Sequence, residues 1–537
     1  MKLTKDIKIV ERFFLQLLNY PYILIGFFIF IAYGNSLLNG IVYLDDDKLV
    51  VNQYQFNHNL ANIPQVFAED IFRNPNKTGY FYRPLLRLTF MADAQFGQEY
   101  VIFFSHFTNL IFHFLAISLF YYLLKQINIK QNFALLIVII AGVHPLTAQT
   151  VAFIPGRNDS LLAVFIILSF IFFLRYTKNN MKKDYIFHIL LFLFALLIKE
   201  SAFVLPLIIS FYILFFTEWK KIIFSKNYYF LLVGWIIMLL IWYILRKSVL
   251  ISPTTNSDLN IIYSLTHNLP TIIPSIGKFI LPFNLSVYPI LNDMKWKYGW
   301  ITIGIVLLIS FFTPKKNFRL ISFGFVWFIL FFISSLIKPT YMTPDFLEHR
   351  LYLPMFGLFF VILGLNKVSF WDKLNKKNQN IFSFILITSI ILVFLRITIS
   401  RNIFYKNGVN FWENAVATSP SLAFNHGNLG TMFFLDGNYI NAAKEFNKAL
   451  EINPLEPIVH NNLGLIYLSQ KQYDQAAEEF QKELEINPNY DTVYYNLGLV
   501  FSKIGETDKA IENWQKVLEI NPNYIKAQEQ LKILNNK

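Results

Sequence analysis

Residues 101–124 read VIFFSHFTNLIFHFLAISLFYYLL, a stretch without Asp, Glu, Lys or Arg. About 20 consecutive apolar residues in a helix are enough to span the hydrocarbon core of a bilayer. Similar runs recur along the chain, because 55% of its 537 residues are hydrophobic, 18% are aromatic and only 15% are charged. The sequence therefore predicts a polytopic helical membrane protein rather than a soluble one.

Charge and cysteine content restrict the class of protein further. The net charge of +13 need not indicate nucleic-acid binding, because most of the Lys/Arg excess lies in short loops between apolar runs. The chain has no cysteine, which excludes disulfides and thiol catalysis. The first apolar run follows Lys2, Lys5, Lys8 and Arg12 without a small-residue cleavage site, and this predicts an uncleaved first span.

The basic loops predict a topology with the N-terminus inside and the C-terminus outside. The stretch 262–284 does not fit as a crossing, because it would place the next basic loop outside. Pro270, Pro274 and Pro282 interrupt it, so we expect a segment that dips into the outer leaflet. The roughly eleven predicted crossings cover residues 21–40, 101–124, 132–152, 159–175, 185–198, 202–217, 228–246, 300–313, 318–337, 351–366 and 380–398.

Ionisable side chains in or beside the apolar runs all fall at the outer face in this topology. Such groups are costly in a membrane and are functional by default. If the topology is right, they lie together and define one site. They are Asp45-Asp46-Asp47, Arg83, His144, Arg157 with Asp159, Lys199-Glu200, and Glu348 with Arg350.

An internal period of 34 residues appears after about residue 400. Leu-Gly pairs recur at Leu429-Gly430, Leu463-Gly464 and Leu497-Gly498, and aromatic and proline positions repeat in the same register. This is the tetratricopeptide (TPR) signature, in which helix–turn–helix units stack into a superhelix with a concave binding surface. We therefore predict a membrane domain at 1–400 with an outward catalytic loop at 41–100, a partial repeat or linker helix at 403–422, and three repeats with a C-terminal helix at 423–537.

One periodic position of the repeats is polar. Asn428, Asn462 and Asn496 precede the three Leu-Gly pairs, on the helix expected to line the groove. An amide offers both donors and an acceptor, so a ladder of asparagines can hold a peptide backbone of any sequence. The alternative is that asparagine serves solubility and local structure at this position.

A series of short motifs runs through the membrane domain. It comprises Leu44-Asp45-Asp46-Asp47, Tyr82-Arg83-Pro84-Leu85, Ser105-His106 through Asn109 to His113, His144-Pro145-Leu146, Pro155-Gly156-Arg157-Asn158-Asp159, Lys199-Glu200, and Glu348-His349-Arg350-Leu351-Tyr352-Leu353-Pro354. Their order, together with the repeats that follow, resembles the transmembrane-and-TPR (TMTC) family of protein O-mannosyltransferases and its bacterial relatives. These belong to the GT-C superfamily of polyprenyl-phosphate-dependent glycosyltransferases. The resemblance covers nearly the whole chain.

The resemblance implies an all-helical GT-C core that uses a sugar, by family analogy mannose, carried on a polyprenyl phosphate. It implies that a carboxylate of the acidic pair after the first span is the general base. Here that pair is Asp45-Asp46, and the additional Asp47 leaves the register open by one residue. Such a carboxylate removes the proton of an attacking hydroxyl, cations stabilise the departing phosphate, and direct displacement inverts the anomeric carbon. The candidate donor-phosphate and substrate-binding residues are Arg83, His144, Arg157, Asp159, Lys199, Glu200, Glu348, Arg350 and Tyr352.

Each of these positions also has a structural alternative. Acids after a span can mark a solvated loop end, and long cationic side chains can reach lipid headgroups. The alternatives are a loop end for residues 45–47; headgroup contact for Arg83 and Arg157; an internal ion pair for Lys199-Glu200; a helix cap for His144; an interface anchor for residues 348–352; and core packing for His106 and His113.

We predict a multi-pass glycosyltransferase of a bacterial inner membrane, with its repeats in the periplasm and a protein Ser or Thr as acceptor. No His/Asp/Glu grouping has metal-ligand spacing, so no metal is expected, and a divalent ion at residues 45–47 is the weaker alternative. Three other functions remain open. They are transfer to a glycan or lipid with repeats that recruit partners, lipid transport, which needs charges along a path through the bilayer, and an inactive membrane scaffold.

Overall fold

The computed structural model describes residues 19–73, 79, 81–220, 225–250, 261–313, 316–337, 346–365 and 376–535. The regular elements in these ranges are helices without a β-strand, and the predicted all-α fold class is confirmed. The chain divides into two compact units, Met1–Asn407 and Gly408–Lys537. The basic residues Lys2, Lys5, Lys8 and Arg12 lie outside the described residues.

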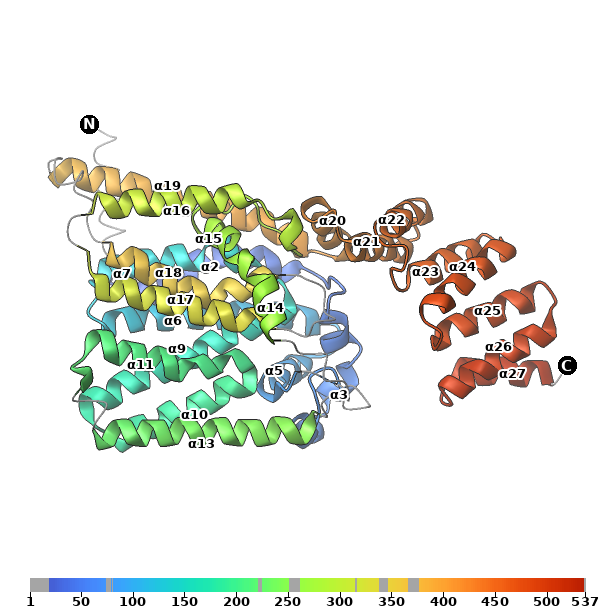
Figure 1. Cartoon of the computed structure of the whole chain (residues 1–537), viewed down its shortest axis with the longest axis horizontal. Coiled ribbons are helices and arrows are strands. Elements are labelled where there is room, and N and C mark those ends of the chain that lie inside the picture. The colour runs from blue at the N-terminus through green and yellow to red at the C-terminus, as the bar shows by residue number, and fades with distance from the viewer. Residues whose placement is uncertain are drawn as a thin grey trace. The chain divides into compact units, whose positions relative to one another are not determined.

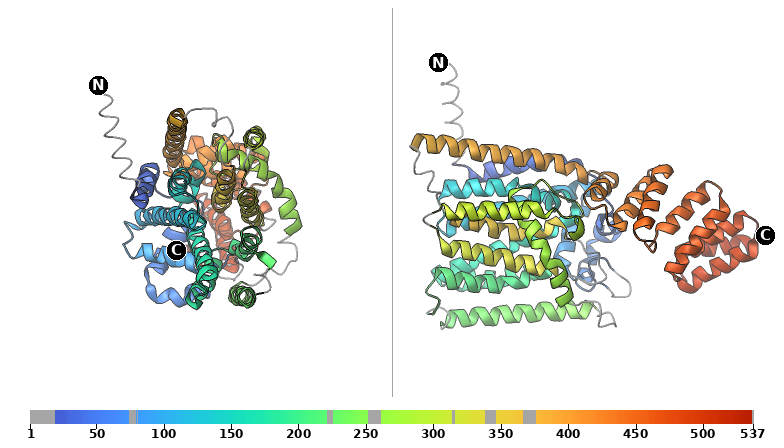
Figure 2. Two further views of the ribbon diagram at one scale, coloured as in Figure 1. Left: turned by 90° about the vertical axis from the view of Figure 1, so that its left-hand side faces the viewer. Right: turned by 45° about the horizontal axis from the view of Figure 1, so that its top comes forward.

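The long helices of the first unit lie side by side, and the short helices α3 and α5 lie at one end of them (Figure 1, Figure 2). Its helices are α2 (Pro21–Tyr33), α3 (Tyr54–His58), α4 (Ile63–Val66), α5 (Pro84–Ala94), α6 (Val101–Gln126), α7 (Gln131–Gly142), α8 (Ala148–Ala152), α9 (Arg157–Asn179), α10 (Lys182–Ile198), α11 (Leu205–Phe216), α13 (Lys226–Val249), α14 (Ile261–Asn268), α15 (Ile272–Ile280), α16 (Trp296–Phe311), α17 (Phe318–Leu336), α18 (Tyr352–Gly364) and α19 (Lys376–Asn402).

Six helical stretches among the described residues are long and apolar enough to cross a membrane. A seventh results if α7 and the following Pro145–Ala152, bent by 49° at the intervening break, count as one span. The shorter apolar helices Glu200–Phe216 and Trp296–Phe311 coincide with two more predicted crossings. The chain is thus a helical membrane protein, whereas eleven crossings and their orientation stay predictions. The long stretches are Pro21–Leu38, Val101–Gln126, Ile154–Asn179, Lys226–Val249, Phe318–Leu336 and Ile385–Tyr405.

The stretch 262–284 is a broken helix. A 3₁₀ turn, Leu269–Thr271, separates α14 from α15 and contains Pro270. Proline lacks the N–H that would continue the helical ladder, so the break follows from the sequence as expected. Whether this segment dips into the outer leaflet stays a prediction.

Small residues set a close contact between α17 and α18. A Cβ atom added to Gly324 of α17 would lie 2.5 Å from the carbonyl oxygen of Gly357 in α18. A Cβ atom added to Gly357 would likewise lie 2.5 Å from the carbonyl oxygen of Gly324. Close backbone approach through small residues is a usual way for helices to pack in a membrane. This contact anchors α18, which follows directly after the Glu348–Arg350 motif.

The second unit is built on the predicted 34-residue period. At each Leu-Gly pair, the glycine leaves room for an aromatic ring of the second helix in the same repeat. A Cβ atom at Gly430, Gly464 or Gly498 would come within 2.6, 2.7 or 2.3 Å of Phe446, Phe480 or Trp514, respectively. The helices are α20 (Gly408–Thr418), α21 (Ala423–Leu435), α22 (Tyr439–Ile452), α23 (Val459–Ser469), α24 (Tyr473–Ile486), α25 (Asp491–Lys503), α26 (Thr507–Ile520) and α27 (Ile525–Asn535).

Candidate active site

The acidic loop after α2 is shaped by the carboxylate of Asp46. This side chain is 1% exposed and accepts the backbone N–H groups of Val42 at 2.7 Å, Leu44 at 3.1 Å and Asp47 at 3.1 Å. Burial raises the pKa of Asp46 to about 6. The Asp46 carboxylate therefore holds the loop in shape through bonds from three backbone N–H groups. We call this carboxylate and its three N–H donors the Asp46 clip.

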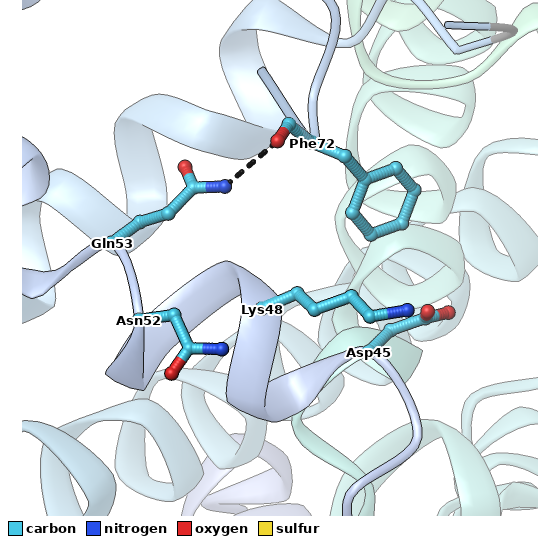
Figure 3. A pocket seen from close by; sticks show the side chains of 5 residues that line it. All are labelled: Asp45, Lys48, Asn52, Gln53 and Phe72. Carbon is cyan, nitrogen blue, oxygen red and sulfur yellow. Dashed lines mark hydrogen bonds between the residues drawn. The ribbon is translucent and has the colours of Figure 1, made fainter. Parts of the chain in front are cut away.

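Asp45 occupies a different position in the same loop. Its φ angle is 76°, in the left-handed region that non-glycine residues rarely adopt and that is often found at functional sites. It lines a pocket of about 350 Å³ together with Lys48, Asn52, Gln53 and Phe72. Figure 3 shows Asp45, Lys48 and Phe72 extending toward one another. Of the acidic pair, Asp45 is the one whose carboxylate faces an open pocket.

A cluster of charges forms where α9 begins and α10 ends. Arg83 donates two hydrogen bonds to Glu200, from Nε at 3.2 Å and from Nη2 at 3.0 Å. Lys199 donates to both carboxylate oxygens of Asp159, at 2.7 and 2.9 Å. Lys199 and Glu200 thus do brace separate segments, but each does so with a partner distant in sequence. We call Arg83, Asp159, Lys199, Glu200 and the neighbouring Arg350 the charged cluster.

His349 lies against this charged cluster. Its Nε2 atom is 3.9 Å from Asp159, and its backbone N–H donates to the side chain of Gln149 at 3.0 Å. Burial and the positive charges of Lys199, Arg350 and Arg83 lower the pKa of His349 well below its ordinary value. Three cations from separate segments, Arg83, Lys199 and Arg350, therefore disfavour protonation of His349, and its imidazole is neutral.

Glu348 is fully buried inside the protein, without exposed area for contact with lipid headgroups. Its carboxylate accepts from Lys278 Nζ at 2.6 Å, from the backbone N–H of Ser286 at 2.9 Å, and from Arg401. Burial alone would raise the pKa of Glu348, but Arg401 and Lys278 outweigh it and lower that pKa below its ordinary value. The interface-anchor alternative is wrong for this residue, which instead joins α15 to the end of α19.

Arg157 is enclosed at the start of α9. Its side chain has no exposed area, so the alternative that it reaches lipid headgroups is wrong. The guanidinium donates to Asp93 at 2.6 Å, Asn109 at 2.7 Å, Thr89 at 3.1 Å and the carbonyl of Ser105 at 2.6 Å. Four bonds within the protein leave little capacity for a donor phosphate, and the geometry favours a structural role.

Three histidines of the motifs are buried inside the bundle and form hydrogen bonds within the protein. His144 caps the following turn, since its Nδ1 accepts from the backbone N–H of Leu146 at 3.1 Å while Nε2 bonds to the Phe279 carbonyl at 2.9 Å. His113 bonds to the hydroxyl of Tyr352 at 2.8 Å and to a backbone carbonyl at 2.9 Å. His106 bonds to the carbonyl of Gly40 at 3.2 Å. These contacts favour capping and packing for His144, His113, His106 and Tyr352 over contact with substrate.

Two of the three periodic asparagines, Asn462 and Asn496, bond to a residue of the preceding repeat. Asn496 donates to Asn461 at 2.9 Å, Asn461 donates to Asn462 at 3.2 Å, and Asn462 donates to Thr431 at 3.1 Å. Asn428 donates to the carbonyl of Phe424 in its own helix at 2.7 Å. This continuous chain favours the alternative of local structure, and peptide binding by Asn428, Asn462 and Asn496 stays a prediction.

Several partners of the candidate residues were not selected from the sequence. Lys278 and Arg401 each lie in or at the end of an apolar run, and the same rule for ionisable groups in a membrane would have found them. Asp93 lies in the short helix α5, outside the long apolar runs that carry this signal, and only its contact with Arg157 reveals it. Among the described residues, no group of three or more His, Cys, Asp or Glu is arranged to hold a metal ion.

Comparison with known proteins places the membrane unit in context. Residues 97–245 match the model of the dolichyl-phosphate-mannose-protein mannosyltransferase family, and residues 430–471, 464–505 and 492–524 match TPR models. The matched family segment begins before α6 and ends in α13, so it contains Arg157, Asp159, Lys199 and Glu200.

Relatives with curated names match over a limited part of their length. The protein O-mannosyl-transferase F38B6.6 of Caenorhabditis elegans is 28% identical over 176 residues, 31% of this chain and 24% of that protein. The protein O-mannosyl-transferase TMTC3 of Mus musculus is 25% identical over 152 residues, 28% of this chain and 16% of that protein. The alignments therefore span about a quarter of these relatives or less.

A solved structure of MamA residues 41-end from Desulfovibrio magneticus RS-1 is 23% identical, with a TM-score of 0.23, and covers 24% of this chain and 72% of that one.

The chain thus joins a segment matching the dolichyl-phosphate-mannose-protein mannosyltransferase family to TPR repeats, and the resemblance to TMTC protein O-mannosyltransferases that its motifs predict is confirmed.

Proposed function

We propose that this membrane protein transfers mannose from a polyprenyl-phosphate carrier to a Ser or Thr hydroxyl of a protein on the outer side of the membrane. The observation that carries the proposal is the charged cluster beside His349, whose Asp159, Lys199 and Glu200 lie in the segment that matches the mannosyltransferase family. Three cations face two carboxylates there, so the cluster retains positive charge. A lipid-linked phosphate has the opposite charge and would be attracted to it.

The acidic loop supplies the other half of the reaction. The acceptor oxygen attacks the anomeric carbon of the donor, the bond from that carbon to the phosphate oxygen breaks, and the acceptor proton passes to the carboxylate of Asp45. Negative charge then develops on the departing phosphate, and Arg83, Lys199 and Arg350 stabilise it. One direct displacement inverts the configuration of the sugar.

Contacts connect the acidic loop to the charged cluster. Gly40, which precedes the loop, is bonded to His106, and the adjacent Ser105 is bonded to Arg157. Arg157 lies two residues before Asp159 of the cluster. These contacts support a base and a phosphate site at the same end of the bundle, as a transfer reaction requires.

The orientation is part of the proposal. We place the N-terminus in the cytoplasm and this end of the bundle, with the repeats, on the outer side of the membrane, where nucleotide sugars are absent. Lipid-linked sugar is then the donor that can reach the site. The repeats are proposed to bring the acceptor protein to it, because stacked TPR helices form a binding surface.

Mass spectrometry of secreted and periplasmic proteins tests the function directly. Cells that contain the protein are expected to carry hexose on Ser or Thr residues of outer-side proteins, and cells without it are expected to lose those modifications. Loss of hexose from glycans or lipids alone, with protein modification unchanged, would contradict the protein acceptor while retaining the transferase.

Deletion of residues 423–537 is expected to separate acceptor recruitment from chemistry. The charged cluster and the acidic loop lie in the first unit, so donor binding should change little. Transfer to a folded protein acceptor should fall at least tenfold, while transfer to a short peptide at high concentration is retained, because the repeats raise local acceptor concentration. Equal transfer to the protein acceptor with and without the repeats would contradict this role.

A further inference from the structure

The end of α19 holds the segment that leads from α2 into the acidic loop. Asn402 Nδ2 donates to the side chain of Asn35 at 2.8 Å and to the carbonyl of Ala32 at 2.9 Å. Asn35 Nδ2 in turn donates to the carbonyl of Ile399 at 3.2 Å. These residues are more than 360 positions apart in sequence, so the contact is made only by the fold.

Two further bonds extend this contact toward the loop. Asn39 Nδ2 donates to the carbonyl of Asn402 at 3.2 Å, and the backbone N–H of Gly40 donates to the carbonyl of Lys406 at 2.8 Å. The carbonyl of Gly40 is bonded to His106 on its other side. We call Asn35, Asn39 and Asn402 the asparagine clasp.

The clasp is more specific than packing alone would require. Asn402 is 0% exposed and Asn39 is 8% exposed. A buried amide is costly unless it is hydrogen-bonded, whereas an apolar side chain would join α2 to α19 without that cost. The two bonds that Asn402 Nδ2 donates, to Asn35 and Ala32, also fix the register of the two segments, because a donor must face its acceptor.

The segment that connects the asparagine clasp to the proposed base, Asp45, is short and hydrogen-bonded. Asp45 follows Gly40 by five residues, and two of the residues between them, Val42 and Leu44, are bonded to the Asp46 clip. A shift of Gly40 therefore passes through a folded turn to Asp45. A displacement of about 1 Å can lower a reaction rate by about 100-fold when a catalytic group must meet a reacting atom.

We propose that Asn402 is a positioning residue for transfer, holding the acidic loop so that Asp45 faces the acceptor. This inference rests on the proposed function for the role of Asp45. The clasp also makes the helix that leads into the repeats part of the catalytic machinery. The end of α19 thus does more than lead the chain into the second unit.

Asn402→Asp in the full-length protein is the sharpest test. It keeps the size of the side chain but replaces the donating Nδ2 by an oxygen that faces Asn35 Oδ1 and the Ala32 carbonyl. We expect kcat to fall by about 10- to 100-fold while KM for the lipid-linked donor changes less than twofold, since the charged cluster is untouched. Ser400→Ala is the matched control, because Ser400 Oγ bonds within α19 to Arg396, and its kinetics should be those of the native protein.

A readout independent of activity comes from the absence of cysteine in the native chain. A spin label on a single cysteine at Tyr43, which is 44% exposed, reports on the loop without competing labels. Its mobility is expected to increase in Asn402→Asp and to stay native in Ser400→Ala. If Asn402→Asp does not insert or fold, Asn35→Ala removes bonds from the opposite side of the clasp and takes its place.

The outcomes separate the inference from the proposed function. A native kcat in Asn402→Asp overturns the positioning role, whether or not the label becomes more mobile, and so does an equal loss of kcat in Ser400→Ala. A native protein that transfers no sugar from any mannosyl-phosphate lipid contradicts the proposed function instead. Label mobility then decides alone whether the clasp holds the loop.

Discussion

Replacement of Asp45 by Asn is expected to lower kcat by about 10²- to 10⁴-fold, the range that a positioned general base contributes. The amide is nearly the same size as the carboxylate but cannot accept the acceptor's proton. Folding and membrane insertion should be native, because the Asp45 side chain lines a pocket, whereas the buried carboxylate that shapes the loop belongs to Asp46. Transfer assayed with a lipid-linked donor and a Ser/Thr peptide provides the measurement.

Two comparison variants make this result specific. Glu99→Gln removes an exposed carboxylate and should leave transfer unchanged. Asp46→Asn should also reduce transfer, but by disordering the loop, because the amide Nδ2 cannot accept the Val42 or Leu44 N–H that it would face. Normal turnover in Asp45→Asn would contradict the role of Asp45 as general base. Loss of activity in Asp46→Asn alone would indicate that transfer depends on the loop shape that Asp46 maintains.

Replacement of Arg157 by Met is expected to destabilise the membrane unit by about 3–5 kcal/mol, because it leaves the carboxylate of Asp93 buried without its charge partner. The same change removes the bonds that join the start of α9 to α5 and α6. Chemical unfolding in detergent micelles measures the loss. Lys178→Met, on an exposed position of the same helix, should have a much smaller effect.

The Arg157 result also distinguishes the two roles that this residue was given. If Arg157 is structural, the surviving folded fraction of Arg157→Met binds the donor normally, and Arg157→Lys recovers only part of the stability because it lacks the planar fork. If instead Arg157→Met is as stable as the native protein and only KM for the donor rises, Arg157 contacts the phosphate. That outcome would restore the prediction made from the sequence.

The repeats and the apolar helices were predictable because their signals are local. A 34-residue period records that Gly430, Gly464 and Gly498 must each make room for a ring in the next helix, so the pattern is present in the sequence itself. Likewise an apolar run reflects the bilayer, which acts on every residue of a span independently. The break between α14 and α15 was also predictable, because Pro270 interrupts the helix locally.

The division of labour among the polar residues was not predictable in this way. Arg83, Asp159, Lys199 and Glu200 do gather, yet Arg157, only two residues from Asp159, faces a different neighbour. Asp45 and Asp46 are adjacent and chemically identical, but one borders a pocket and the other is enclosed by three backbone N–H groups. Sequence spacing does not say which of two neighbouring side chains will point into a site.

By itself, then, the sequence determined that this is a helical membrane protein with TPR repeats and a TMTC-like series of motifs, since composition, period and motif order are properties of the chain. Tertiary structure alone decided which acids are buried in ion pairs, which carboxylate borders a pocket, and that Asn402 meets Asn35. The reason is physical: an ion pair or a hydrogen bond forms within about 3 Å of space, and separation along the chain does not specify that distance.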